Sequence, residues 1–256
     1  MSRSLTTILV FLTFLSAFSQ IVLMNEVPQT PIDLAAVIVP PQEILKDISL
    51  LCLGSSGNLN FSKDAGIAVG KILKEKNVSY YVFGTFDVLK VGDSDPLSKV
   101  SSSPYITAQV LSLFAEGLSI VGVVPVFNAT GNIDTQVVTA LVTRNATYPV
   151  MVENKEKYAL LKRFGYTTSL VFDTDGNILV GRPIRFPWSY ENDIDFERLR
   201  REILENSIVL INRDVGRISV NDPWDGGVLI FSDETWLKEI AKEVLSGKRS
   251  PTGRIP

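Results

Sequence analysis

The chain has 256 residues, of which 45% are hydrophobic and 21% are charged. This is an ordinary globular composition, long enough for one large domain or two small ones. The net charge of −3 argues against a nucleic-acid or anionic-membrane partner, because such surfaces select for clustered Lys and Arg. The chain has no histidine, the commonest metal ligand and the commonest general base at neutral pH. We expect neither a cofactor nor a metal.

The N-terminus has the pattern of a secretory signal peptide. Arg3 supplies a short basic region, residues 5–15 are apolar, and the small residues Ala17 and Ser19 stand at the cleavage positions. An uncleaved anchor is the alternative, because the apolar stretch continues weakly through residues 22–23. Beyond this point no run is long enough to span a bilayer. We therefore expect a secreted, periplasmic or cell-envelope protein without a membrane span after cleavage.

The first half of the mature chain alternates between strands and helices. The single cysteine, Cys52, excludes an intrachain disulfide, and its apolar surroundings predict a buried core thiol. Residues recurring at four-residue spacing predict a helix over 62–76, with Ser62 as a plausible cap. The predicted strands cover residues 34–39, 48–53 and 78–83. This order predicts parallel pairing, with helices packed on a sheet.

Residues 104–135 read as a helix, a glycine turn, a strand at 121–126 and a loop rich in Asn, Thr and Gly. In α/β enzymes such a loop lies at the carboxyl end of a strand, where active sites are built.

Later segments are less specific. The aromatic residues Trp188 and Tyr190 could stack on sugar faces or simply pack the loop at 182–194. Residues 196–204 form a charged amphipathic helix with a solvated face. A last helix is predicted with a buried stripe of Trp236, Ile240 and Val244, and with Ser232 or Asp233 as its cap.

Several of these segments resemble glycoside hydrolase family 3, which contains β-N-acetylhexosaminidases and β-glucosidases. The family pattern A-G-x-A-x-G-x-x-L is matched by residues 65–73. A strand ending in P-V-x-D-V is represented by residues 85–88. Because the family's aspartate there binds sugar hydroxyls, the resemblance makes Asp87 a substrate-binding candidate. From the residues alone, a loop or capping aspartate is the alternative.

The match continues through residues 104–126 but departs from the family where its chemistry lies. The family continues with G-V-x-P-V-x-K-H-F-P-G-H-G-D-T. Here Asn128 stands near the lysine position, both histidines are absent, and Asp134 precedes the final threonine. The resemblance makes Asn128 and Asp134 further substrate-binding candidates. A sugar site built on this pattern would lack most of its charged hydrogen-bonding groups, which are the strong ones.

Residues 161–173 resemble the family's L-R-x-x-L-G-F-x-G-x-V-x-S-D, whose final aspartate is the nucleophile. The resemblance points to Asp173, since a carboxylate at a strand end can attack an anomeric carbon. The competing interpretation is a hairpin over residues 171–180, because Asp175-Gly176 between two β-rich runs is the strongest short hairpin signal. A calcium site at Asp173, Asp175 and Asn177 is excluded, because position 12 of such a loop would be Ile184.

Chain length limits the fold. A complete (β/α)₈ barrel takes about 250 residues and rarely fewer than about 200. We therefore expect an α/β fold with a shrunken or incomplete TIM-barrel-like parallel sheet and flanking helices, plus a short α/β C-terminal segment. The expected divisions are a signal peptide at 1–19, a degenerate family 3-like domain at 20–205 and a remnant of the family's second domain at 206–256, opened by a strand at 206–213. The tail would either add strands to the sheet or pack beside it.

Two functional hypotheses follow. One is an exported, catalytically impaired relative of the family that binds glycan or a partner. The other is an active retaining exo-β-glycosidase with Asp173 as nucleophile, in which Glu153, Asp134 or an acid from the tail replaces the missing acid/base.

Overall fold

The computed structural model describes residues 20–187, 194–211 and 227–254. The predicted signal peptide at 1–19 lies outside the described residues, as do Trp188, Tyr190 and the end of the predicted strand at 206–213. Within the described ranges no helix is both long enough and apolar enough to span a bilayer.

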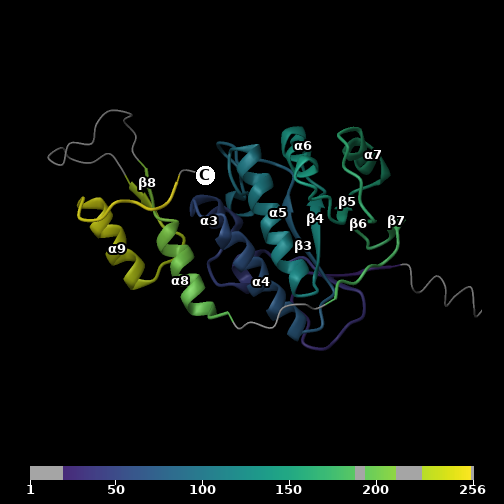
Figure 1. Cartoon of the computed structure of the whole chain (residues 1–256), viewed down its shortest axis with the longest axis horizontal. Helices are drawn as coiled ribbons and strands as arrows, with labels where there is room; N and C mark the ends of the chain where they lie inside the picture. Colours follow the sequence, from purple (N-terminus) through teal and green to yellow (C-terminus); the bar gives the residue numbers. More distant parts are fainter. Residues whose placement is uncertain (1–19, 188–193, 212–226, 255–256) are drawn as a thin grey trace, which may run out of the picture.

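In the described part of the chain, seven strands form one curled sheet, and their order in the sheet is their order in the sequence (Figure 1). The first six run parallel, and the seventh pairs antiparallel with the sixth. The strands are β1 (Val22–Met24), β2 (Ala35–Val37), β3 (Tyr80–Thr85), β4 (Val124–Ala129), β5 (Val150–Val152), β6 (Leu170–Asp173) and β7 (Ile178–Gly181). The predicted fold class, an incomplete barrel-like parallel sheet with flanking helices, is confirmed.

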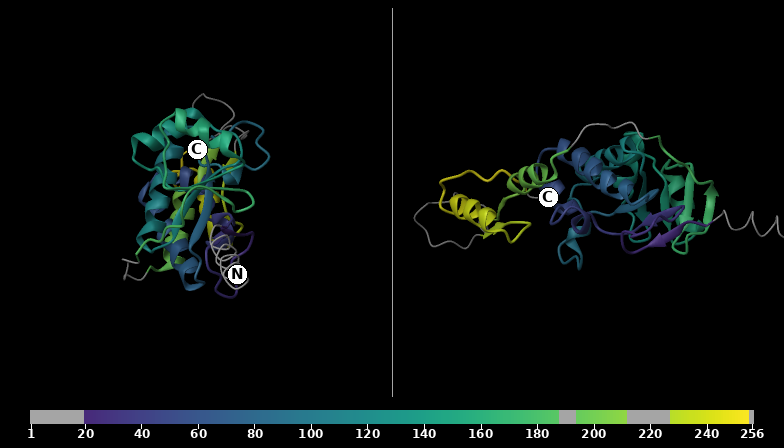
Figure 2. Two further views of the ribbon diagram at one scale, coloured as in Figure 1. Left: turned by 90° about the vertical axis from the view of Figure 1, so that its right-hand side faces the viewer. Right: turned by 90° about the horizontal axis from the view of Figure 1, so that it is seen from below.

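Helices cover the outer face of this sheet (Figures 1 and 2). They are α2 (Pro41–Ile44), α3 (Leu50–Ser55), α4 (Asn60–Glu75), the 3-10 turn η1 (Pro96–Ser98), α5 (Pro104–Ile120), α6 (Thr135–Thr143) and α7 (Lys155–Arg163). The inner face carries a second, smaller apolar core, which includes Tyr80, Val126 and Phe172. Ile184 and Phe186, which follow β7, pack against this inner core.

The two edges of the curled sheet meet at one point. Gln20 and Asn177 form an antiparallel bridge, and the Ile21 N–H donates to the Gly176 carbonyl over 2.8 Å. The Gln20 amide donates to the Asp175 carbonyl over 3.0 Å. Gly176 has φ +82°, and a Cβ there would lie 2.0 Å from the Ile21 carbonyl, so the contact requires glycine. The hairpin between β6 and β7 thus joins the two ends of the sheet.

The predicted strand at 48–53 is wrong, because this segment forms helix α3. The Ser49 side chain accepts a hydrogen bond from the Cys52 N–H over 3.1 Å and caps the helix. All six residues of α3 are buried, so its apolar run has no polar face that would separate a helix from a strand. Cys52 is fully buried as predicted, and burial raises the pKa of its thiol to about 12.

Helices α4 and α5 confirm the predicted helices and approach each other closely through glycine. A Cβ on Gly66 would lie 2.2 Å from the Phe114 carbonyl, and one on Gly117 would lie 2.2 Å from the Lys63 carbonyl. The small residues at 65–70 therefore have a packing role. Ser62 is not the cap: it lies in the first turn of α4, and its buried hydroxyl has no hydrogen-bond partner among the described residues.

The chain from α8 onward packs against the helices α3 and α4, and its described residues add no strand to the curled sheet. It contains α8 (Phe196–Asn206), a separate antiparallel pair of β8 (Val209–Ile211) and β9 (Gly227–Leu229), and α9 (Thr235–Leu245). In α9 the buried residues are Leu237, Ala241 and Val244, whereas Trp236 and Ile240 are only partly buried. The predicted cap at Ser232 or Asp233 is also wrong, since the N-cap is Glu234 without a side-chain hydrogen bond.

Arg200 on α8 joins this segment to the rest of the chain. Its side chain is only 10% exposed. The guanidinium donates to Asp47 over 2.8 Å and to Glu234 over 2.6 Å, and Nε donates to the Lys46 carbonyl over 2.9 Å. One arginine therefore connects α8, the N-terminal segment and the start of α9.

Candidate functional site

The four residues singled out from the sequence all lie at the carboxyl-terminal edge of the curled sheet. Asp87 follows β3, Asn128 lies near the end of β4, Asp134 is the N-cap of α6, and Asp173 ends β6. Because these strands are parallel, their carboxyl ends share one edge. We name this the carboxyl edge.

The structure brings three of the four residues close together. The Asp134 N–H donates to the carbonyl of Phe86, the residue before Asp87, over 2.6 Å. Asn128 is the strand partner of Thr85, at the end of β3. Asp173 is separate, because β6 lies three strands from β3, which is roughly 14 Å along the sheet.

Asp87 is held by two lysines. Its side chain is 5% exposed, with Lys90 Nζ at 2.9 Å and Lys99 Nζ at 3.3 Å. The Val88 N–H donates to the same carboxylate over 2.9 Å. Burial alone would raise the pKa of Asp87, but the lysine contacts and the backbone hydrogen bond outweigh it and lower this pKa. Asp87 is therefore an anion whose oxygens are already occupied.

Asn128 and Asp134 also bond within their own loop. Asn128 Oδ1 accepts from the backbone N–H of Thr130 over 3.1 Å and from its hydroxyl over 2.7 Å. Asp134 Oδ1 accepts from the N–H groups of Gln136 and Val137 over 2.8 and 3.3 Å, which caps α6. Both side chains have a local structural role.

Asp173 organises the turn between β6 and β7. Its carboxylate accepts from the Asp175 N–H over 2.9 Å, from the Asn177 N–H over 2.9 Å and from the Asn177 amide over 3.1 Å. Partial burial opposes the charge, but the hydrogen bonds from Asn177 and Asp175 prevail and lower the pKa of Asp173. The predicted hairpin is confirmed by the antiparallel pairing of β6 with β7.

Asp173 also faces the helix side of the sheet. It lies two residues after Val171 and opposite Val152, and both valines pack in the core beneath the helices. Phe172, between them, packs in the inner core. Because alternate residues of a strand share a face, Asp173 projects away from the interior of the curl.

A retaining glycosidase requires two carboxyl groups about 5–5.5 Å apart. Asp87 and Asp173 lie three strands apart. Glu153, next to the end of β5, is 49% exposed and pairs with Lys157 on α7 over 3.6 Å. The chemistry that this arrangement supports directly is hydrogen bonding and charge pairing within the protein.

Sequence reasoning missed a cavity at the opposite edge of the sheet. This cavity, of about 440 Å³, opens where β3 and β4 begin. Its polar lining residues belong to the end of α4, to turns and to the segment after β7, which carry no motif that points to a site. Separately, the described residues contain no group of three or more His, Cys, Asp or Glu side chains that could hold a metal ion.

Comparisons with known proteins were made at three levels. No protein-family model matches the sequence. No curated protein matches it either. Among solved structures, a glycosyl hydrolase of the GH3 family from Mycobacterium smegmatis and LpqI from M. tuberculosis each align with a TM-score of 0.43 at 17% identity. β-Glucosidase 3B from Thermotoga neapolitana, in complex with glycerol, aligns with a TM-score of 0.48 at 14% identity.

These alignments are partial. They cover 54%, 54% and 68% of this chain, and 58%, 56% and 38% of the three proteins in the same order. The chain therefore spans less than two thirds of the length of each. The glycosyl hydrolase from M. smegmatis is a member of the family that the sequence motifs resemble.

Proposed function

We propose that this chain is an exported, non-catalytic protein with a glycoside hydrolase-like fold, and that it binds glycan or a partner through the carboxyl edge. The observation that carries this proposal is that each of the four candidate side chains already hydrogen-bonds or pairs within the chain itself. Asp87 is paired with lysines, Asn128 and Asp134 bond within their loop, and Asp173 bonds within its hairpin. A nucleophile needs a free, correctly placed oxygen, whereas the oxygens of these side chains hold the loops and the hairpin of the carboxyl edge in place.

Catalysis would also need an acid and a nucleophile on the same substrate. The lysines around Asp87 hold it as an anion, so at neutral pH it cannot donate a proton as a general acid. Asp173 is likewise an anion, but it lies on the helix side of the sheet. This supports the proposal, because Asp87 does not supply the acid that a nucleophilic Asp173 would need.

The binding surface would include the connection from β3 to α5. This connection, residues 86–103, is irregular apart from the short 3-10 turn η1, and it exceeds the roughly 12–15 residues beyond which irregular loops in compact domains are uncommon and usually functional. It presents Val91, which is fully exposed, and Leu97, which is 41% exposed. Lys90 adds a half-exposed charge beside them. Loops held on a rigid scaffold commonly carry binding residues, which supports this connection as the contact surface.

Turnover of aryl β-glycosides tests the absence of catalysis. We expect the wild-type protein and Asp173→Asn to release no aryl alcohol above buffer. Measurable turnover by the wild type, abolished in a folded Asp173→Asn protein, would contradict the proposal and support the retaining glycosidase. Circular dichroism of the variant establishes that it is folded.

Binding is tested with a soluble β-1,4-linked N-acetylglucosamine oligomer as the probe, by calorimetry. We expect a heat of binding that Val91→Ser weakens and that Val180→Ser leaves unchanged, since Val180 is an exposed valine on β7. If the wild type does not bind the oligomer, the glycan half of the proposal is rejected. The proposal then rests on recognition of a protein partner. Export is tested separately by N-terminal sequencing of the protein made in an exporting host, which should begin at Gln20.

A further inference from the structure

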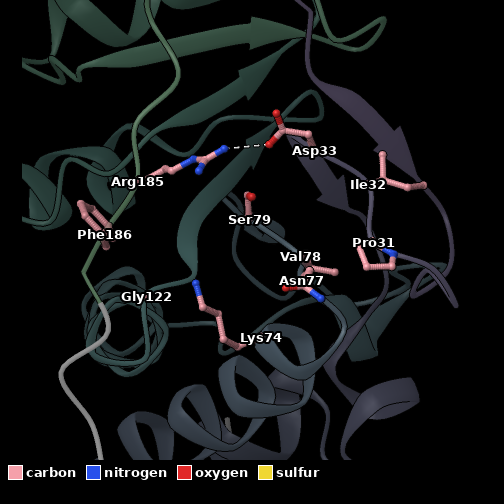
Figure 3. Close-up of a pocket in the computed structure, with 10 residues that line it drawn as sticks. All are labelled: Pro31, Ile32, Asp33, Lys74, Asn77, Val78, Ser79, Gly122, Arg185 and Phe186. Carbon is pink, nitrogen blue, oxygen red and sulfur yellow. Dashed lines mark hydrogen bonds and ion pairs between the residues drawn. The ribbon is translucent and has the colours of Figure 1, made fainter.

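The cavity at the amino-terminal edge of the sheet is built from four separate parts of the chain. It is lined by the loop between β1 and β2, the turn between α4 and β3, the turn before β4 and the segment after β7 (Figure 3). Its volume of about 440 Å³ lies within the range of roughly 300–1,000 Å³ of small-molecule pockets. We name it the amino-edge cavity.

Three polar side chains in the amino-edge cavity have hydrogen-bonding groups to spare. Lys74, at the end of α4, points its ammonium group into the space, with Ser79 across from it and Asn77 beside it (Figure 3). Within the described ranges, none of these three side chains has a hydrogen-bond or ion-pair partner in the protein. At the carboxyl edge, by contrast, each of the four candidate side chains has a hydrogen-bond or ion-pair partner within the chain.

The charges of the cavity favour an anion. Arg185 and Asp33 pair with each other over 2.8 Å and close one side of it. Lys74 adds a second cation, which leaves one positive charge uncompensated among the lining residues. Since a charge-assisted hydrogen bond is roughly twice as strong as a neutral one, a carboxylate placed near Lys74 would gain most.

The remaining walls favour a hydroxylated ligand with an apolar face. Phe186 lines the side opposite Pro31 and Ile32 (Figure 3). An aromatic ring can cover the C–H face of a sugar ring, while the Ser79 hydroxyl and the Asn77 amide each supply both a donor and an acceptor for hydroxyl groups. An apolar wall with a few convergent polar groups is the usual composition of a small-molecule site.

We propose that the amino-edge cavity binds a small hydroxylated carboxylate of monosaccharide size, such as a hexuronic acid, with Lys74 on the carboxylate and Asn77 and Ser79 on the hydroxyl groups. This site is distinct from the carboxyl edge and does not depend on the function proposed there. Asn77 has φ +57°, a conformation that Asn and Gly adopt readily, so its backbone role is separable from its amide. Asn77→Gly keeps the turn and removes only the amide.

The experiment is a calorimetric titration of the protein with glucuronate, glucose and inorganic phosphate. We expect glucuronate to bind roughly tenfold or more tightly than glucose or phosphate, because only glucuronate offers both a carboxylate and a set of hydroxyls. Lys74→Met should weaken glucuronate binding roughly tenfold or more, and Asn77→Gly should weaken it by a smaller factor. Lys76→Met, at the exposed end of the same helix, is the matched control and should bind as the wild type does.

Several results would overturn the proposal. They are the absence of glucuronate binding, equal binding of glucose and glucuronate, equal binding of phosphate and glucuronate, or full binding by a folded Lys74→Met protein. Backbone amide shifts in the nuclear magnetic resonance spectrum locate the site independently. Shifts confined to residues 31–33, 74–79 and 185–186 support the cavity, and shifts confined to residues 86–103 reject it.

Discussion

Replacing Asp173 separates a structural carboxylate from a catalytic one. The side chain accepts three hydrogen bonds, at 2.9, 2.9 and 3.1 Å, from the turn that follows it. A hydrogen bond to a charged group is worth about 1.5–3 kcal/mol net, but this side chain is partly exposed and water would replace part of the loss. We therefore expect Asp173→Ala to lower the free energy of unfolding by about 1–3 kcal/mol. Asp173→Asn, which keeps one oxygen, should cost about 1 kcal/mol.

The loss should extend beyond the hairpin itself. The turn that Asp173 holds also presents the Gly176 carbonyl to the N–H of Ile21, 2.8 Å away, where the edges of the sheet meet. For a protein of this size each 1 kcal/mol corresponds to about 2–4 °C in the midpoint of thermal unfolding. Urea unfolding followed by circular dichroism measures the free energy, and Asp175→Asn is the control. Asp175 lies in the same turn, and its exposed carboxylate has no partner in the described part of the chain.

The effect should depend on pH with a definite sign. The pKa of Asp173 is lower in the folded protein than in the unfolded chain, where an aspartate titrates near about 4. Its contribution is therefore fully present above about pH 4 and is lost as the pH falls through the folded-state pKa. The difference in stability between wild type and Asp173→Asn should narrow in acid. Equal stability of the two proteins at pH 7, or a gap that widens below pH 4, would refute the reasoning.

Three further changes test the packing. Gly66→Ala should lower the free energy of unfolding by about 1–3 kcal/mol in urea titrations, because its Cβ would meet a backbone carbonyl of α5 at 2.2 Å. Gly131→Ala is the control and should leave the free energy of unfolding nearly unchanged, because the space around Gly131 is open. The Cys52 thiol, with its pKa raised to about 12 by burial, should react with an aromatic disulfide reagent only after unfolding, and rapid reaction of the native protein would contradict its burial. Arg200→Met should cost about 1–3 kcal/mol, because the arginine is only 10% exposed but its partners Asp47 and Glu234 are 40% and 35% exposed, so water replaces part of the loss. The exposed Arg198→Met should cost under about 1 kcal/mol in the same titrations.

Local signals in the sequence were sufficient for much of the fold. The Asp-Gly pair predicted the hairpin because few residues other than glycine adopt the positive φ of Gly176. Hydrophobic periodicity predicted α4 and α5. Periodicity could not identify α3, whose residues are buried on every side, or separate β1 from the apolar N-terminal stretch. The conformations of α3 and β1 depend on the tertiary contacts that surround them, which local sequence does not contain.

The sequence by itself determined which chemical groups are available: a chain without histidine, with aspartates after β3, before α6 and at the end of β6. Only the tertiary structure decided how those groups are used. Lys90 and Lys99, which belong to no recognisable motif, pair with Asp87. Because successive side chains of β6 point to opposite faces of the sheet, Asp173 faces the helices. The amino-edge cavity likewise exists only because four segments far apart in the sequence meet, and no local pattern records such a meeting.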